Sequence, residues 1–314
     1  NWHIFTWNVG TPWRVEVMEV MELATVEVVA IEVKPALGNG VVTYATGLAF
    51  NSAGGAPLIL STCHMAYHDL TLAVAFGAGH GPVLEAEVMA STRLELSTEA
   101  FRSLASRGWR CGTGTFLDPS VSCTLQLHLL RPKFWKSAQG NHQVASGLRL
   151  SGATPCDTWI GRQVVLHGAP FGARVDGPGG ALWSRFSQVL MRGVVSNLST
   201  PPGLLLSDVN LAEGCAGGAL ILEDSNEVVA LMAPSLRSSS GESVALSLAI
   251  PMSVILETLM DDDMCRAQLG DHDITVLSAV PAPVAAQGPS PPSEVVKVWP
   301  CFGWTVAAGL LPSS

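Results

Sequence analysis

The chain has 314 residues, of which 48% are hydrophobic and only 14% are charged. Such a composition can bury a sizeable core and argues against intrinsic disorder. The 17 basic and 26 acidic residues give a net charge of −9, which argues against nucleic acid or an anionic membrane as the main partner. No stretch reaches the roughly 18 uninterrupted apolar residues of a membrane span. No leader pattern follows Asn1, so no signal peptide is predicted.

The chain contains seven cysteines at irregular spacing, an odd number without any C-x-x-C pair. A secreted domain of this size would carry paired cysteines, so we predict a reducing compartment. The spacing also argues against a zinc site, and we expect neither a metal nor another cofactor. The acidic run at residues 261–263 predicts a solvated helix end rather than a cation site. The cysteines are Cys63, Cys111, Cys123, Cys156, Cys215, Cys265 and Cys301.

Strands dominate the prediction for the first part of the chain. Residues 14–34 alternate valine with glutamate, which favours strands. A helix is the weaker alternative, because β-branched residues lose rotamer freedom there. After a turn signal at residues 38–40, the segments 41–50 and 58–62 predict two further strands joined by a Gly-Gly loop.

Short strands continue along the chain after one helical interruption. Residues 97–107 predict a short helix, with Ser97 or Thr98 as its cap and Gly108 after its end. Strand-like segments bounded by Gly, Pro, Ser or Asn then recur up to a terminal helix over residues 252–260. This pattern indicates an all-β barrel or sandwich rather than βαβ units. The segments are 121–130, 144–150, 163–167, 187–196, 203–207, 218–223, 227–233 and 244–250.

The composition changes after the terminal helix. Residues 261–294 become rich in proline, alanine and serine, which is typical of a linker. An apolar, strand-like pattern resumes over residues 295–314, where we predict the start of a truncated further domain. The assignment of residues 1–40 beyond their strand pattern stays open.

Two short stretches have the residue types that acyl transfer needs. Residues 58–66 form an apolar strand that ends in a small-residue turn presenting His64, and residues 213–220 form a glycine-rich turn that enters an apolar strand. A histidine with a pKa near 7 can take a proton from a nucleophile. A glycine-rich turn can point backbone N–H groups at a developing oxyanion.

These stretches resemble the histidine segment and the Gly-x-Ser-Gly-Gly turn of the trypsin-like serine proteases, particularly the HtrA-like branch. Three further segments resemble strands of that branch in the same chain order: 157–172 with its Gly-Ala-Pro-Phe-Gly loop, 193–197, and the Ser-Leu-Ala-Ile-Pro segment 247–251. Within the branch, the set is most similar to the degenerate amino-terminal domain of the peroxisomal leader-peptide-processing proteases. The resemblance covers roughly residues 41–260.

The resemblance implies a trypsin-like double six-stranded antiparallel β-barrel with a short C-terminal helix. The barrels would span about residues 11–135 and 144–260. For the full-length protein it implies serine endopeptidase activity in the peroxisomal matrix, carried by an active protease domain of the same polypeptide. Peptide segments and a second copy of the chain are further expected partners. This chain itself carries no targeting signal, and a cytosolic location is the alternative.

The nucleophile position of the resemblance is Ala216, which has no hydroxyl and cannot form an acyl-enzyme. Gly214, Cys215 and Ala216 form the expected oxyanion turn. Cys215 is adjacent to the nucleophile position, but it cannot take over that role unless the turn is remodelled. The sequence therefore predicts a non-catalytic protease-like module that supports the active domain by packing, self-association or peptide binding.

The base and acid positions have ordinary alternatives. His64 occupies the base position of the resemblance, although a histidine at a strand end is also commonly a packed residue. The acid strand opens with Ser122 and Cys123 in place of an aspartate. Asp118, the acid candidate, precedes a proline, as ordinary turn aspartates often do. We interpret the other histidines as structural or surface residues, among them His68, His80, His128, His142 and His167.

Two other functions remain open from the sequence. The chain could be an active peptidase that uses an unrecognised nucleophile, such as Cys215 or a serine outside the motif. It could also be a β-barrel binding protein unrelated to proteases.

Overall fold

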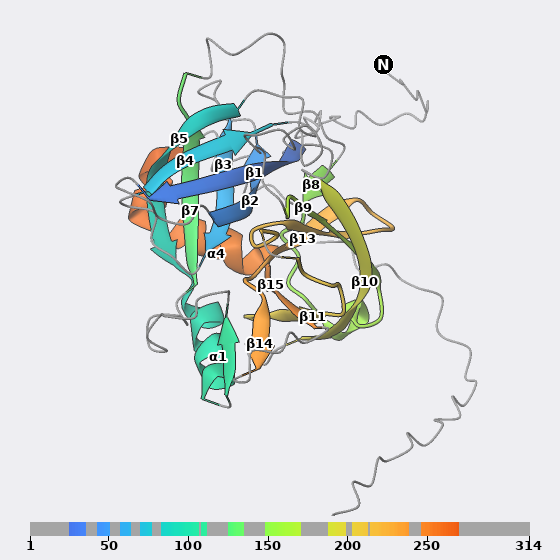
Figure 1. Ribbon diagram of the computed structural model, residues 1–314. Helices are drawn as coiled ribbons and strands as arrows, with labels where there is room; N and C mark the ends of the chain where they lie inside the picture. Colours follow the sequence, from blue (N-terminus) through green and yellow to red (C-terminus); the bar gives the residue numbers. More distant parts are fainter. Residues whose placement is uncertain are drawn as a thin grey trace, which may run out of the picture. The chain divides into compact units, whose positions relative to one another are not determined.

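The computed structural model describes residues 25–35, 43–50, 57–63, 70–76, 83–106, 108–111, 125–134, 148–170, 188–198, 203–212, 214–238 and 246–269. These residues form mainly β-strands with a few short helices, which confirms the predicted all-β class (Figure 1). Residues 261–269 of the predicted linker are described and are mostly helical, so the linker prediction is wrong there, because Cys265 and Leu269 are buried in the core. Residues 270–294, the predicted further domain and residues 1–24 lie outside the described residues.

The first six long strands close into an antiparallel barrel. They pair in the order β1-β2-β3-β7-β5-β4, and β4 pairs back with β1. The strands are β1 (Thr25–Pro35), β2 (Thr43–Phe50), β3 (Leu58–Cys63), β4 (Leu70–Ala75), β5 (Val83–Arg93) and β7 (Gln126–Pro132).

Strand β1 shows why this part of the sequence forms a strand. Val29, Ile31 and Val33 pack inside the barrel, whereas Val26 and Val28 pack into a second core outside it. Both faces of β1 are therefore buried, and a strand buried on both faces favours the valine and isoleucine side chains found here. The helical alternative is wrong for residues 25–35.

The second group of strands pairs in a ring of its own. β12 pairs with β9, which continues through β10, β11, β15 and β13 and back to β12, always antiparallel. The short β8 (Leu148–Leu150) links the two groups, since it pairs with both β1 and β13. The ring strands are β9 (Gln163–Gly168), β10 (Val189–Leu198), β11 (Leu205–Ser207), β12 (Ala219–Leu222), β13 (Glu227–Met232) and β15 (Ser247–Pro251); η1 (Asp157–Trp159) precedes β9.

A shared core joins the two groups and the terminal helix α4 (Met252–Asp261). Ile255 and Leu259 are fully buried on the inner side of α4. The acidic run closes this helix as predicted. Asp261 and Asp263 are exposed, whereas the Oδ1 atom of Asp262 accepts a 2.8 Å hydrogen bond from Cys265 N, in the helical segment that follows.

Between β5 and β7 the chain leaves the barrel as α1 (Glu95–Ala105) and β6 (Trp109–Cys111). β6 pairs only with β14 (Leu236–Ser238) among the described strands. In Figure 1, β6 lies between α1 and β14, away from the barrel. Residues 95–111 are called the α1–β6 arm below.

The predicted cap of this helix is wrong. The residue at the N-cap position is Leu94, and Ser97 and Thr98 lie fully buried in the first turn. Their hydroxyls make tertiary hydrogen bonds instead, because the first turn of α1 packs against other parts of the fold.

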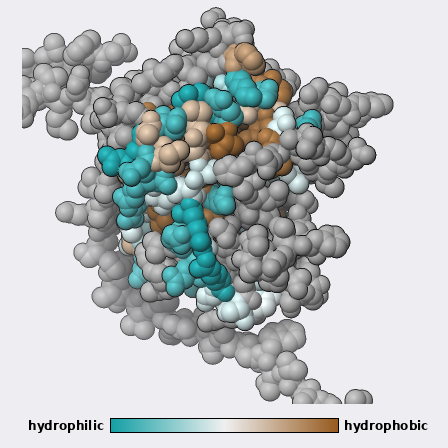
Figure 2. All heavy atoms as spheres, turned by 90° about the vertical axis from the view of Figure 1, so that its left-hand side faces the viewer, coloured by the Kyte–Doolittle hydropathy of each residue, from teal (hydrophilic) through white to brown (hydrophobic). Residues whose placement is uncertain are grey.

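On the face seen in Figure 2, the coloured residues are mostly hydrophilic, with hydrophobic residues gathered in a smaller patch.

Candidate functional site

The glycine-rich turn at residues 214–218, called the junction turn below, lies where the two groups of strands meet. Thr46 on β2 holds it from the first barrel. Its backbone N–H donates to Ala216 O at 2.8 Å, and its hydroxyl donates to Gly214 O at 2.8 Å. The same hydroxyl accepts from Ala169 N at 3.0 Å. One buried threonine therefore fixes the backbone on both sides of Cys215.

The second ring holds the junction turn from the other side. Gly217 N donates to Met232 O, and Met232 N donates to Gly218 O, both at 2.8 Å. Within the turn, Gly218 N donates to Cys215 O at 2.9 Å. The hydroxyl of Thr62, near the end of β3, adds a 3.0 Å bond to Met232 O. The turn is therefore a rigid backbone structure that both groups of strands share.

The glycines of the turn are required by its geometry. Gly214 has φ +89° and Gly217 has φ +81°, a region that favours glycine. A Cβ at Gly214 would collide with Pro170 O, and one at Gly217 would collide with Thr46 O. The glycine pattern seen in the sequence thus serves a close approach of backbones.

Ala216 presents a methyl group at the centre of this turn. It is half-buried, whereas its neighbour Cys215 is fully buried among the apolar side chains of the second ring. Burial raises the pKa of Cys215 to about 12, although a backbone hydrogen bond from Ala212 lowers it in part. Cys215 is therefore a packed, neutral thiol at neutral pH. Since only the thiolate is a good nucleophile, this cysteine is not reactive.

His64 and Asp118 both lie outside the described residues, as do Ser122 and Cys123. The end of β3, directly before His64, and the start of β7, eight residues after Asp118, are described. β3 ends at Cys63, which pairs with Gln126 at the start of β7. The hydroxyl of Thr62 also reaches Met232 O beside the turn. β3 therefore ends, and β7 begins, at the same end of the barrel as the junction turn, and Cys63 directly precedes His64.

The two described histidines have structural settings. His128 is fully buried in the first barrel, and its Nδ1 atom lies 2.7 Å from Ser91 Oγ on the neighbouring strand. Burial lowers the pKa of His167, and a hydrogen bond with Gln188 opposes that shift. Gln188 also donates to Val28 O at 2.9 Å, which ties the second ring to the first barrel.

Sequence reasoning did not find Thr46, the residue that clasps the junction turn. A threonine in an apolar strand has no motif that marks it. Thr46 stands out only in the structure, where it is a fully buried polar residue and so needs hydrogen-bond partners.

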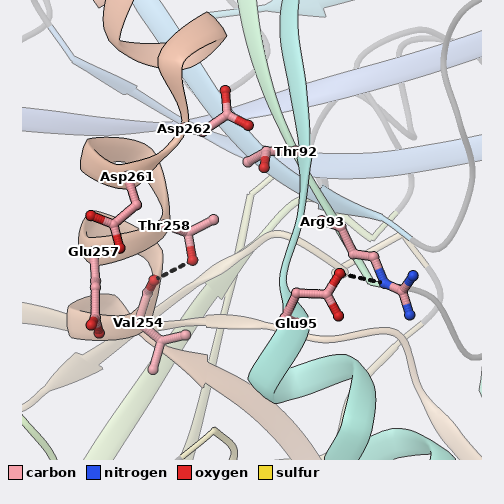
Figure 3. Close-up of a pocket in the computed structure, with 8 residues that line it drawn as sticks. All are labelled: Thr92, Arg93, Glu95, Val254, Glu257, Thr258, Asp261 and Asp262. Carbon is pink, nitrogen blue, oxygen red and sulfur yellow. Dashed lines mark hydrogen bonds and ion pairs between the residues drawn. The ribbon is translucent and has the colours of Figure 1, made fainter.

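A hollow of about 330 Å³, separate from the junction turn, lies between the end of β5 and α4 (Figure 3). Thr92, Arg93 and Glu95 form one side, with Arg93 Nε 3.1 Å from Glu95 Oε1. Asp262 lies across from them. Partial burial would raise the pKa of Asp262, but hydrogen bonds from Cys265 and Thr92 outweigh it and the pKa is lowered. The lining contains neither histidine nor cysteine.

Within the described part of the chain, no group of three or more His, Cys, Asp or Glu side chains could hold a metal ion. None of the described helices is long and apolar enough to cross a membrane. No protein-family model matches the chain, and no curated protein sequence is similar to it.

Proposed function

We propose that this chain is a trypsin-like protease module of the HtrA-like branch that has lost its catalytic nucleophile. The observation that carries the proposal is Ala216, which places a methyl group at the centre of a glycine turn that hydrogen bonds hold on both sides. Acyl transfer at this position requires a hydroxyl or thiol. The adjacent Cys215 is buried and neutral, and so supplies none.

The arrangement around the turn supports this proposal over an unrelated binding barrel. A closed six-stranded barrel and a second ring of six strands meet at the turn. The strand that leads to His64 and the strand that follows Asp118 begin or end beside each other. A protease scaffold needs its base, acid and nucleophile positions to converge, and the meeting of these strand ends near the turn supports such a scaffold over a binding barrel, which has no need of it.

We propose further that the module belongs to a peroxisomal leader-peptide-processing serine endopeptidase and supports an active domain of the same polypeptide. The support is the order of motifs along the chain, which is that of the HtrA-like branch. In this role the junction turn has kept its backbone because it joins the two groups of strands, whether or not chemistry takes place there. Packing, self-association and peptide binding are the activities such a module can supply.

The first experiment uses a fluorophosphonate probe that labels activated serines. The natural chain stays unlabelled. Ala216→Ser restores a hydroxyl at the half-buried position and gains labelling, and a further His64→Ala substitution abolishes it. Ala212→Ser is the matched control, since it adds a hydroxyl to a half-buried position beside the same turn. Labelling of the natural chain at any serine would overturn the proposal.

A thiol-reactive probe tests the remaining nucleophile. Exposed Cys156 reacts in the native protein, whereas buried Cys215 reacts only after unfolding. Peptide mapping by mass spectrometry distinguishes the two cysteines. Native labelling of Cys215 would show a reactive thiol and favour the active-peptidase alternative.

A further inference from the structure

The α1–β6 arm is firmly anchored at its base. Leu94 N donates to Leu125 O at 3.0 Å where the arm leaves and rejoins the barrel. The Ser97 hydroxyl donates to Gly203 O at 2.7 Å, and Leu125 N donates to Thr98 Oγ1 at 3.1 Å. Ser97 and Thr98 are both fully buried. The first turn of α1 is therefore part of the fold.

The tip of the arm is held much more weakly. The chain reverses at Gly108, which is exposed and has φ +86°, and returns as β6. β6 and β14 form a separate two-stranded sheet with three residue pairs, Trp109 with Ser238, Arg110 with Arg237 and Cys111 with Leu236. An isolated two-stranded ribbon is only marginally stable in water. Besides this pairing, Trp109 of β6 is partly buried against the shared core. Opening the tip therefore costs three residue pairs and the partial burial of Trp109, which is less than opening the barrel, whose strands pair on both sides.

The partner of β6 starts close to the junction turn. β14 begins four residues after Met232, whose backbone is bonded to both Gly217 and Gly218. Among the described strands, β14 pairs with β6 alone and is not part of the second ring. A strand in this position presents backbone N–H and C=O groups that another extended segment can pair with.

We infer that the α1–β6 arm is an internal occupant of a peptide-binding edge: β6 takes on β14 the place of an extended peptide, which binds by strand addition only when the arm opens. The tether gives β6 an effective concentration in the millimolar range. For a peptide that binds free β14 with a dissociation constant of about 10 µM, the tethered β6 therefore weakens the apparent affinity by about 100-fold. This inference does not depend on the identity of residue 216.

The probe for the test is a fluorescein-labelled peptide with the sequence of residues 106–113 and the substitution Cys111→Ser. In the β6-replacement variant, residues 106–111 of the protein become an alternating Gly-Ser segment of equal length, so the anchored base stays intact. Fluorescence anisotropy should show at least 100-fold tighter binding to this variant than to the natural chain.

A matched control carries Arg237→Pro in the β6-replacement background. Proline removes a backbone donor of β14 and disfavours its pairing, so this variant should lose the gained affinity. Equal peptide binding by the natural chain and the β6-replacement variant would overturn the inference. Retained binding after Arg237→Pro would also overturn it, since the peptide would then lie elsewhere.

Hydrogen–deuterium exchange tests the same inference on the unaltered protein. Amides of β6 and β14 should exchange at similar rates, and faster than amides of β13, because they are exposed together when the ribbon opens. If β14 exchanges only as slowly as β13, the ribbon opens only with global unfolding and the arm is a fixed part of the fold. This measurement needs no variant that could fail to fold.

Discussion

The junction turn and the α1–β6 arm both connect the first barrel with the second half of the chain, but they do so with very different rigidity. The turn is bonded to β2 and β13 and is mostly buried. The tip of the arm is held by three residue pairs and the partial burial of Trp109, and it follows an exposed glycine. The comparison teaches that the backbone around Ala216 is held firmly by both groups of strands, whereas the tip of the arm is held loosely.

Two glycines with the same backbone conformation give the largest contrast. Gly217→Ala should destabilise the protein by roughly 2–6 kcal/mol, because left-handed strain and overpacking each cost about 1–3 kcal/mol. Its Cβ would collide with Thr46 O. Gly161→Ala is the control, since Gly161 has φ +83° but no atom near its absent Cβ. Chemical denaturation measures both. Equal losses would show that the turn is not tightly packed against β2.

The clasp of the turn should have the next largest effect. Thr46→Val keeps the shape of the side chain but leaves Gly214 O and Ala169 N without their buried partner. We expect a loss of about 2–4 kcal/mol in the free energy of unfolding, since each unsatisfied buried group costs about 1–3 kcal/mol. Thr71→Val, at an exposed position of β4, is the matched control and should have little effect. A loss below that of the control would show that the clasp does not stabilise the junction.

The arm should respond to the equivalent glycine change with a small global effect. Gly108→Ala strains the reversal before β6 and should cost about 1 kcal/mol or less globally, because the ribbon opens instead of transmitting the strain. Amide exchange should accelerate at residues 236–238 and stay unchanged at β13. If β13 accelerates equally, the arm and the ring form one cooperative unit.

The smallest expected effect is a pH dependence of the stability, caused by His167 in the second ring. Burial lowers the pKa of His167, so the folded state binds fewer protons than the unfolded state near pH 6. Stability should therefore fall as the pH drops below about 6.5, the usual pKa of histidine. His167→Gln should flatten this part of the profile, as measured by denaturation between pH 5 and 7 (a range set by that same pKa). An unchanged slope would place the titration elsewhere.

Several elements were predictable because their signals are local. The segments 58–62, 163–167, 227–233 and 252–260 agree with β3, β9, β13 and α4 to within a residue or two. Each is a short apolar run bounded by turn residues, and burial on both faces leaves little choice of structure. The glycines of the junction turn were likewise visible, since left-handed backbone requires glycine wherever it occurs.

Other strands were missed because their reason for being strands is not local. β4 and β5 close the first barrel against β1 and β7, and neither has a strong pattern of its own. Strands β6 and β14 are three residues each and exist only because they pair with each other. Ser97 was predicted to be a helix cap, yet its hydroxyl serves Gly203, 106 residues away. Such partners cannot be identified from one segment alone.

The sequence by itself determined the all-β class, many of the short strands and the presence of a glycine-rich turn around Ala216, because periodicity, turn residues and side-chain chemistry are properties of short segments. The tertiary structure alone decided that Thr46 clasps the turn, that Cys215 is buried and neutral, and that β6 occupies β14. Those features depend on contacts between residues far apart in the chain, which arise only when the backbone groups of both halves find their partners in the folded state.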